Sequence, residues 1–99
     1  MTSKEICGIV GKDYLYDVLI EECAELVQAL IKYRRSRKGF DQHLDSVECW
    51  ENVIEECADV ELMLEIIKST AMRNEDRSKV VNIVADKYRR FKDRIGGLT

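Results

Sequence analysis

The sequence predicts an all-α protein, an antiparallel helical bundle of three long helices preceded by a short N-terminal helix. Apolar residues recur at intervals of three and four along most of the chain, which is the spacing of one helix face. There is no proline, and 35% of the 99 residues are charged with both signs mixed, a composition typical of helix-rich soluble proteins. This length suits one core, so we predict a single domain over residues 1–99.

The first half of the chain predicts a short helix and then a long one. A capping-box pattern at residues 2–5 starts the short helix, and Gly8 and Gly11 are expected to end it. The long helix should run from about Asp13 to about Arg37. Its stripe at helical spacing consists of Leu15, Val18, Leu19, Leu26, Val27, Leu30 and Ile31.

The end of this long helix is basic. The positive charges either complement the helix C-terminus or, for one or two of them, reach a phosphate. They are Lys32, Arg34, Arg35, Arg37 and Lys38. Gly39 is the expected stop, and residues 40–44 should form a loop in which His43, the only histidine, faces solvent. A di-iron bundle needs a Glu-x-x-His motif on each of two helices, so redox iron is disfavoured.

Two further long helices complete the predicted bundle. Asp45 should cap one that ends near Met72, and Asn74 another that ends near Ile95. The inward stripe of the helix that Asp45 caps is Cys49, Val53, Cys57, Val60, Met63, Leu64 and Ile67. The inward stripe of the helix that Asn74 caps is Val80, Val84, Tyr88, Phe91 and Ile95. Trp50 is expected to pack at a helix or subunit contact rather than to stack on a base. Because three helices leave a thin core, we predict that oligomerisation, as a homodimer or homotetramer, completes the bundle.

Two pairs of acidic residues interrupt these apolar stripes. Glu22 and Glu25 share a helix face, as do Glu56 and Asp59. Acidic residues on a helix usually form a solvated face, but both pairs here are aimed at the core. Carboxylates in such a place are very unfavourable unless something positive neutralises them. A hard divalent cation with oxygen ligands is the interpretation that we favour.

The sequence segments around these two pairs resemble those of a known protein family. Glu21-Glu22-x-x-Glu25 and Glu56-x-x-Asp59, with their apolar flanks, resemble the signature of the MazG-like all-α nucleoside triphosphate pyrophosphohydrolases over residues 14–92. The resemblance implies hydrolysis of a (deoxy)nucleoside triphosphate to the monophosphate and pyrophosphate. It also implies Mg²⁺, or Mn²⁺ in its place, held by the four carboxylates Glu22, Glu25, Glu56 and Asp59.

The resemblance gives further residues a role. Glu21 would orient or deprotonate the attacking water. The segment 87–90 resembles the basic part of the last family helix, which contacts phosphates, so Lys87 and Arg90 are candidate phosphate ligands. Lys32 is a third candidate, from the basic end of the first long helix. From its helical position alone, Lys87 could equally extend to water.

Composition excludes several other classes. No apolar run is long enough to span a membrane and no export signal is visible, which predicts a cytoplasmic protein. The net charge of −3 argues against a nucleic-acid binder, which ranks last among the alternatives. The four cysteines form no CxxC pair and should be free and mostly buried. The main alternative to an enzyme is a non-catalytic dimerisation or regulatory module with a structural divalent cation.

Overall fold

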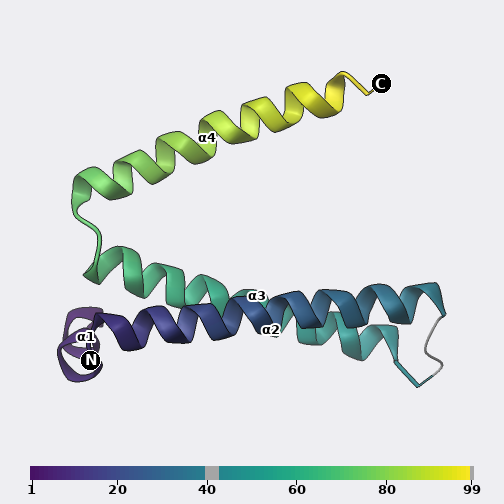
Figure 1. Cartoon of the computed structure of the whole chain (residues 1–99), viewed down its shortest axis with the longest axis horizontal. Coiled ribbons are helices and arrows are strands. Elements are labelled where there is room, and N and C mark those ends of the chain that lie inside the picture. The colour runs from purple at the N-terminus through teal and green to yellow at the C-terminus, as the bar shows by residue number, and fades with distance from the viewer. Residues whose placement is uncertain (40–42, 99) are drawn as a thin grey trace.

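The described part of the chain forms four consecutive α-helices. A computed structural model describes residues 1–39 and 43–98, and within these ranges there is no strand. The helices are α1 (Ser3–Val10), α2 (Lys12–Lys38), α3 (Ser46–Thr70) and α4 (Asn74–Gly96). Figure 1 shows α2 and α3 as an antiparallel hairpin, with α1 at its open end. The predicted all-α class and the order of the helices are confirmed.

The ends of the helices follow the predicted capping signals with two exceptions. The Thr2 hydroxyl accepts a hydrogen bond from the Glu5 N–H at 3.1 Å and starts α1. Gly8 lies inside α1 instead of ending it, because only Gly11, at φ 84°, has a conformation that other residues avoid. Arg73, not Asn74, is the N-cap residue of α4, and its N–H donates to the Asp76 carboxylate at 3.1 Å.

The connection between α2 and α3 also begins and ends at the predicted residues, Gly39 and Asp45. Gly39 is left-handed at φ 71° and ends α2, as a glycine after a helix commonly does. The predicted loop at 40–44 lies partly outside the described residues; within it, His43 is exposed. Asp45 caps α3 by accepting hydrogen bonds from the N–H groups of Val47 at 2.8 Å and Glu48 at 3.4 Å.

Removal of the Asp45 cap should measurably lower the free energy of unfolding. Asp45→Ala leaves two N–H groups at the start of α3 without their side-chain acceptor. The expected loss is about 1 kcal/mol of unfolding free energy, which lowers the Tm by roughly 4–8 °C. Thermal unfolding followed by circular dichroism measures this. Ser46→Ala, one residue further on, keeps the Asp45 cap and serves as control; an equal loss in both variants would contradict the assignment.

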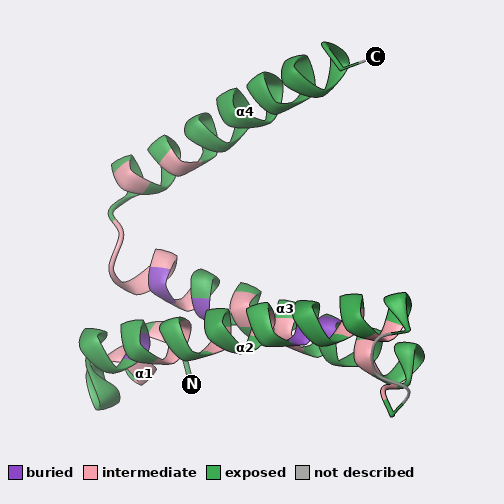
Figure 2. Cartoon of the chain, turned by 45° about the vertical axis from the view of Figure 1, so that its right-hand side comes forward, coloured by how far each residue is buried: buried purple, intermediate pink, exposed green. Residues whose placement is uncertain are grey.

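The core lies along the seam between α2 and α3. Figure 2 shows the buried segments confined to this seam. Near α1, Leu15 packs with Met63 and Ile67, and residues of α1 such as Ile6 cover them. Ala29 and Val53 are the other buried residues. The hairpin is therefore held by a narrow apolar strip rather than by a wide core.

Helix α4 lies apart from the hairpin (Figures 1 and 2). Among the described residues it forms no packed face with the other helices, and none of its residues is buried. The predicted inward orientation of its apolar stripe is therefore wrong for the single chain. Val80 is half-buried, whereas Val84, Tyr88, Phe91 and Ile95 are exposed. The physical reason is that α2 and α3 use their inner faces on each other, and α4 leaves the end of α3 in another direction.

Part of the predicted stripes on α2 and α3 is also exposed. Five of the residues predicted to face inward lie on the outside: Val27, Leu30, Ile31, Cys57 and Leu64. The prediction of mostly buried thiols is wrong for a related reason. All four cysteines are free, but Cys23 and Cys57 are exposed and Cys7 and Cys49 are only half-buried. Cys23 and Cys57 directly follow inward-facing glutamates, so one helical step turns them outward.

None of the described helices combines the length and the apolar character needed to cross a membrane.

Candidate metal centre

Two glutamates occupy core positions in the α2–α3 seam. Leu15, Glu22 and Ala29 follow one another at intervals of seven residues, so they lie on the same side of α2. Leu15 and Ala29 are buried, and Glu22 stands half-buried between them. Glu56 holds the same kind of position on α3, seven residues before the buried Met63, and is also half-buried. The placement of these carboxylates in the apolar stripe, predicted from the sequence, is confirmed.

The helix pair brings the predicted carboxylates of the two motifs together. Glu22, Glu56 and Asp59 can each offer one oxygen, and these oxygens lie within 4.8 Å of one another. Glu25 belongs to the same cluster, because its charge acts on both Glu22 and Glu56 and its side chain hydrogen-bonds to Glu56. Glu25 and Asp59 are exposed, at the rim of the seam, so the prediction that both pairs are aimed at the core is wrong for these two residues. Each lies one position before an inward-facing residue, and that step turns its side chain toward solvent. The cluster is thus open to solvent on one side and closed on the other.

On the closed side, two carboxylate oxygens have no partner. The Oε2 atoms of Glu22 and Glu56 are inaccessible to solvent and accept no hydrogen bond. A buried polar atom without a partner is unfavourable, and more so when it carries charge. A proton or a cation between these oxygens would remove that cost.

The pKa values of both seam glutamates respond to this environment. Burial raises the pKa of Glu22 to about 7, with further contributions from the negative charges of Glu25, Asp59 and Glu56. Burial and the negative charge of Glu25 also raise the pKa of Glu56, while a hydrogen bond with Glu22 acts in the opposite direction. Without a cation, the cluster therefore holds a proton near neutral pH.

The donor set fits a hard divalent cation. All candidate ligand atoms are carboxylate oxygens, which suit Mg²⁺ or Mn²⁺ rather than the softer metals that bind sulfur and imidazole. Glu22 and Glu56 would supply the oxygens that now lack a partner, and Asp59 and Glu25 the solvent-side ligands. Because Mg²⁺ keeps several waters, the open side would leave room for water and for phosphate oxygens.

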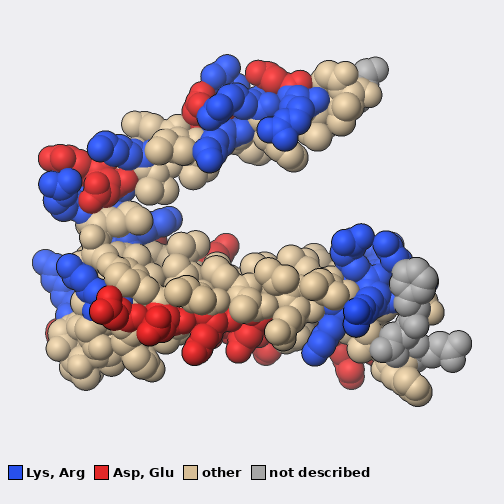
Figure 3. Space-filling model, viewed as in Figure 1, with Lys and Arg blue, Asp and Glu red and all other residues tan. Residues whose placement is uncertain are grey.

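The cluster lies on an acidic face of the hairpin. On both helices, the residue that precedes an inward-facing residue projects toward the acidic face. Glu21 and Glu25 of α2 therefore lie on the same side of the hairpin as Glu55 and Asp59 of α3. Figure 3 shows the acidic side chains gathered along one edge of the hairpin. Glu21 is exposed and adjacent in sequence to Glu22, as a residue acting on water at the cluster would have to be.

One predicted phosphate ligand lies on the same face. Lys32 follows Glu25 by seven residues, so it projects to the same side of α2, about 10 Å further along the axis. Its side chain is exposed. An extended lysine in this position can approach a phosphate chain that starts at the cluster.

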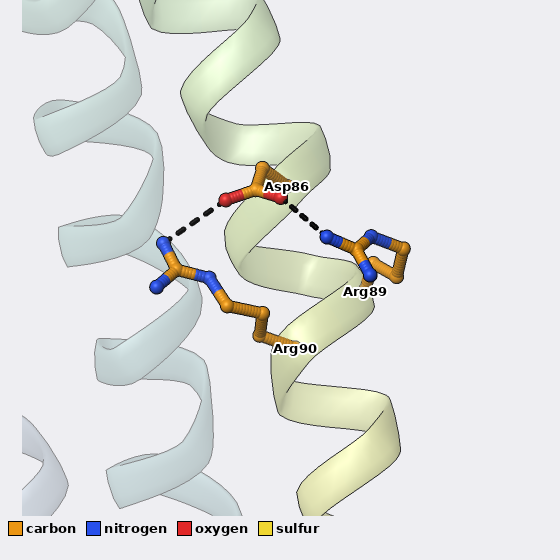
Figure 4. A network of polar contacts seen from close by, with 3 residues as sticks. All are labelled: Asp86, Arg89 and Arg90. Atoms are coloured by element: carbon orange, nitrogen blue, oxygen red, sulfur yellow. Dashed lines mark hydrogen bonds and ion pairs between the residues drawn. The ribbon is translucent and has the colours of Figure 1, made fainter.

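The two predicted phosphate ligands on α4 are not brought to the cluster within one chain. Lys87 and Arg90 line a shallow surface of α4 with Phe91 and Arg94. Figure 4 shows that Arg90 pairs with Asp86 of its own helix, at 3.0 Å, while Arg89 pairs with the same carboxylate at 2.7 Å. Since α4 does not pack on the hairpin, these cations remain separate from the four carboxylates.

Tyr33, Trp50 and Arg37 form an aromatic and cationic group near the α2–α3 connection, which was not predicted from the sequence. Tyr33 and Trp50 lie with ring centroids 4.9 Å apart, which places Trp50 at a helix contact as predicted. Arg37 donates a hydrogen bond to the Tyr33 hydroxyl at 3.1 Å and lies over the ring, 5.9 Å from its centroid. The signal was present, because Tyr33 follows Leu26 by seven residues and so continues the inward stripe.

Comparisons with known proteins give no match: no family model fits the sequence, and no curated protein or solved structure is significantly similar to the chain.

Proposed function

We propose that the protein is a Mg²⁺-dependent nucleoside triphosphate pyrophosphohydrolase. The observation that carries this proposal is the cluster of Glu22, Glu56 and Asp59, with Glu25 beside it, in which two buried oxygens lack a hydrogen-bond partner. The MazG-like pattern of the two motifs supports the choice of reaction. In that reaction, water attacks the α-phosphorus and the bond to the bridging oxygen of the β-phosphate breaks. The products are a nucleoside monophosphate and pyrophosphate.

In the proposed reaction, different residues would bind the cation, the attacking water and the phosphates. Glu22, Glu25, Glu56 and Asp59 would hold Mg²⁺, or Mn²⁺ in its place. A bound divalent ion neutralises phosphate oxygens and lowers the pKa of a coordinated water. Glu21 would orient the attacking water or accept its proton. Lys32, together with Lys87 and Arg90, would stabilise the negative charge that develops on pyrophosphate.

Assembly and location are further parts of the proposal. We expect a homodimer or homotetramer, because so much apolar surface of the single chain is exposed. In that assembly, α4 of a neighbouring chain could supply the basic residues that α4 of the same chain keeps away from its own cluster. A cytoplasmic location is also part of the proposal, because it agrees with a nucleotide substrate.

One observation favours a second candidate function. Glu22 and Glu56 face each other from different helices at core positions, so a cation between them would join α2 to α3. A structural cation in a non-catalytic dimerisation or regulatory module would bind in the same place. It would raise the melting temperature without any turnover.

The deciding experiment is a substrate panel. Purified protein is incubated with canonical and modified nucleoside triphosphates, in ribo and deoxy forms, with Mg²⁺ or with EDTA, and the products are separated by chromatography. The proposal requires monophosphate and pyrophosphate in equal amounts with Mg²⁺ and none with EDTA. Diphosphate and phosphate as products would show a different cleavage site. No turnover, together with a Mg²⁺-dependent rise in Tm, would establish the structural-cation alternative.

A further inference from the structure

Helix α4 carries an apolar stripe that no other described helix covers. Its members recur at intervals of three and four residues, and each exposes 45–67% of its surface. We call this set the α4 stripe: Val81, Val84, Tyr88, Phe91 and Ile95. Because α4 forms no packed face with the rest of the described chain, the α4 stripe is available to a partner outside the chain.

Cationic side chains border the α4 stripe on both sides. Lys92 lies over the Tyr88 ring, with its Nζ atom 4.7 Å from the ring centroid. On the other border, Lys87 and Arg94 line one shallow surface together with Phe91. At about 100° per residue, these three cations lie roughly 70–90° from the middle of the stripe. At that angle, the methylene groups of a long side chain can lie along the apolar surface while its charge reaches water or a phosphate.

The acidic side chains in the same part of α4 lie opposite the stripe. Asp86 and Asp93 are turned about 170° away from its middle. Asp86 pairs with Arg89 at 2.7 Å and with Arg90 at 3.0 Å, on the side that Figure 4 shows. Residues 86–95 contain five cationic and two acidic side chains, a net charge of +3, although the whole chain has −3. Helix α4 therefore combines an apolar stripe, basic borders and a polar back.

We infer that α4 binds flat on an anionic lipid surface, with the α4 stripe among the headgroups and Lys87, Lys92 and Arg94 on lipid phosphates. An apolar face bordered by cations is typical of helices that lie in the plane of a membrane surface. The helix is not apolar enough to cross the bilayer. Figure 3 shows the acidic edge of the hairpin on the side remote from α4, so a negative surface at α4 is kept away from those carboxylates.

Other partners fit this face less well. Two copies of α4 laid stripe on stripe would bring their basic borders together, and like charges at close range repel. A nucleic acid would match the cations through its phosphates but would leave the apolar stripe without a partner. Anionic lipid supplies both an apolar layer and phosphates.

The inference rests on the exposed face of α4 and holds whether or not the protein hydrolyses nucleotides. Lys87 and Arg90 are also the candidate phosphate ligands of α4. A helix that lies on a membrane cannot give these cations to a carboxylate cluster, so the two roles exclude each other for any one copy of α4. The test therefore contains no nucleotide.

The test measures binding of the full chain to large unilamellar vesicles by co-sedimentation, in EDTA. EDTA prevents a divalent ion from linking the carboxylate cluster to lipid phosphate. One vesicle is phosphatidylcholine alone, and the other is an equimolar mixture of phosphatidylcholine and phosphatidylglycerol. Wild-type protein should partition at least about tenfold more strongly onto the anionic vesicle, and about 0.5 M salt should weaken this preference.

Single substitutions assign the binding to the proposed face. Phe91→Ser removes an apolar side chain from the α4 stripe and should lower the partition coefficient at least about tenfold. Lys92→Gln removes a border cation and should lower it about fivefold. Lys79→Gln is the matched control, because Lys79 is exposed on the same helix but lies about 150° from the middle of the stripe. Its partition coefficient should stay within about twofold of wild type, since a charge more than a Debye length from the surface is screened.

Equal binding to the two vesicles, or none to either, would overturn the inference. Equal losses in Lys79→Gln and Lys92→Gln would show that net charge alone drives binding. A loss in Lys92→Gln with none in Phe91→Ser would identify a partner that contacts only the cations, as a nucleic acid does, and the inference would be wrong.

Amide hydrogen exchange on the wild-type protein guards against variants that fail to fold. In the presence of the anionic vesicles, exchange over residues 84–95 should slow at least about tenfold, whereas the buried part of α3 should not change. Slower exchange at the basic end of α2 instead would place the lipid contact there and contradict the inference. Equal protection of residues 84–95 without vesicles would show that protein already covers the α4 stripe, which would also overturn it.

Discussion

Glu56→Gln should lower the kcat/KM for nucleoside triphosphate hydrolysis at least about 100-fold. Glu56, like Glu22, lies close to the other three carboxylates of the cluster. The amide keeps the shape of the side chain but removes the negative charge that binds a cation. Residues that only support metal ligands already cost 10–100-fold when changed, so loss of a ligand should reach at least the upper end of that range. Initial rates over a Mg²⁺ titration measure the loss.

Glu55→Gln provides the matched control for this prediction. It makes the same chemical change one residue earlier on α3, at an exposed glutamate outside the group whose oxygens lie together. We expect its rate to stay within about threefold of wild type, since exposed single charges have small effects. Equal losses in the two variants would show that net charge, and not the cluster, determines activity.

Metal-free protein should lose stability as the pH rises from about 5 to about 8. The pKa of Glu22 is raised by burial to about 7 in the folded state, from an ordinary value of 4.5 in the unfolded chain. Between these two values the folded state binds more protons than the unfolded state. The free energy of unfolding therefore falls with increasing pH, and the stability is fully present below about pH 4.5 and lost above about pH 7. The raised pKa of Glu56 acts in the same direction.

This prediction is measured as Tm against pH in EDTA, where a decrease on the order of 5 °C is expected. The Asp76 carboxylate does not interfere, because the Arg73 N–H lowers its pKa below 3.8 and its titration falls outside this range. Glu22→Gln should flatten the curve, since it removes the group that titrates. Mg²⁺ should restore stability most at high pH, where it no longer competes with a proton. A Tm that rises with pH in EDTA would contradict the proposed proton.

The helices and most of their ends were predictable because they depend on local chemistry. Asp45 and Thr2 carry acceptors for the first N–H groups of a helix, and Gly39 adopts the left-handed conformation that ends one. These signals act within a few residues, so the sequence alone contains them. The misplacement of the α4 cap by one residue shows their limit, because asparagine is a preferred N-cap residue, yet the backbone makes Arg73 the N-cap of α4.

The carboxylate cluster was predictable because its residues contradict the surrounding apolar pattern. Glu22 and Glu56 break apolar stripes at positions where leucine or methionine would be expected, and a break of that kind needs a partner. That the two motifs meet across the seam follows from an antiparallel hairpin with nearly equal arms. The positions of Lys87 and Arg90 relative to the cluster could not be predicted, since they depend on where α4 packs.

Burial was the least predictable property, and the reason is geometric. In the sequence, two adjacent apolar stripes on one helix cannot be distinguished from a single broad apolar stripe. Val27 and Leu30 share the apolar character of Leu26 and Ala29, yet only the latter two face α3. Periodicity identifies which residues are apolar together, but the partner helix decides which of them are covered.

The hairpin topology has a consequence for the order in which the structure forms. Contacts that close the shortest loop cost the least chain entropy, so Tyr33 and Trp50, next to the connection, can meet first. Glu22 and Glu56 are twice as far apart in sequence, and Leu15 and Met63 are farther apart still. If the two helices associate progressively from the connection, the like-charged Glu22 and Glu56 come together before the apolar cluster of Leu15 and Met63 forms. Folding of the metal-free chain should be slowed by high pH at this middle stage, and a divalent ion would remove the barrier.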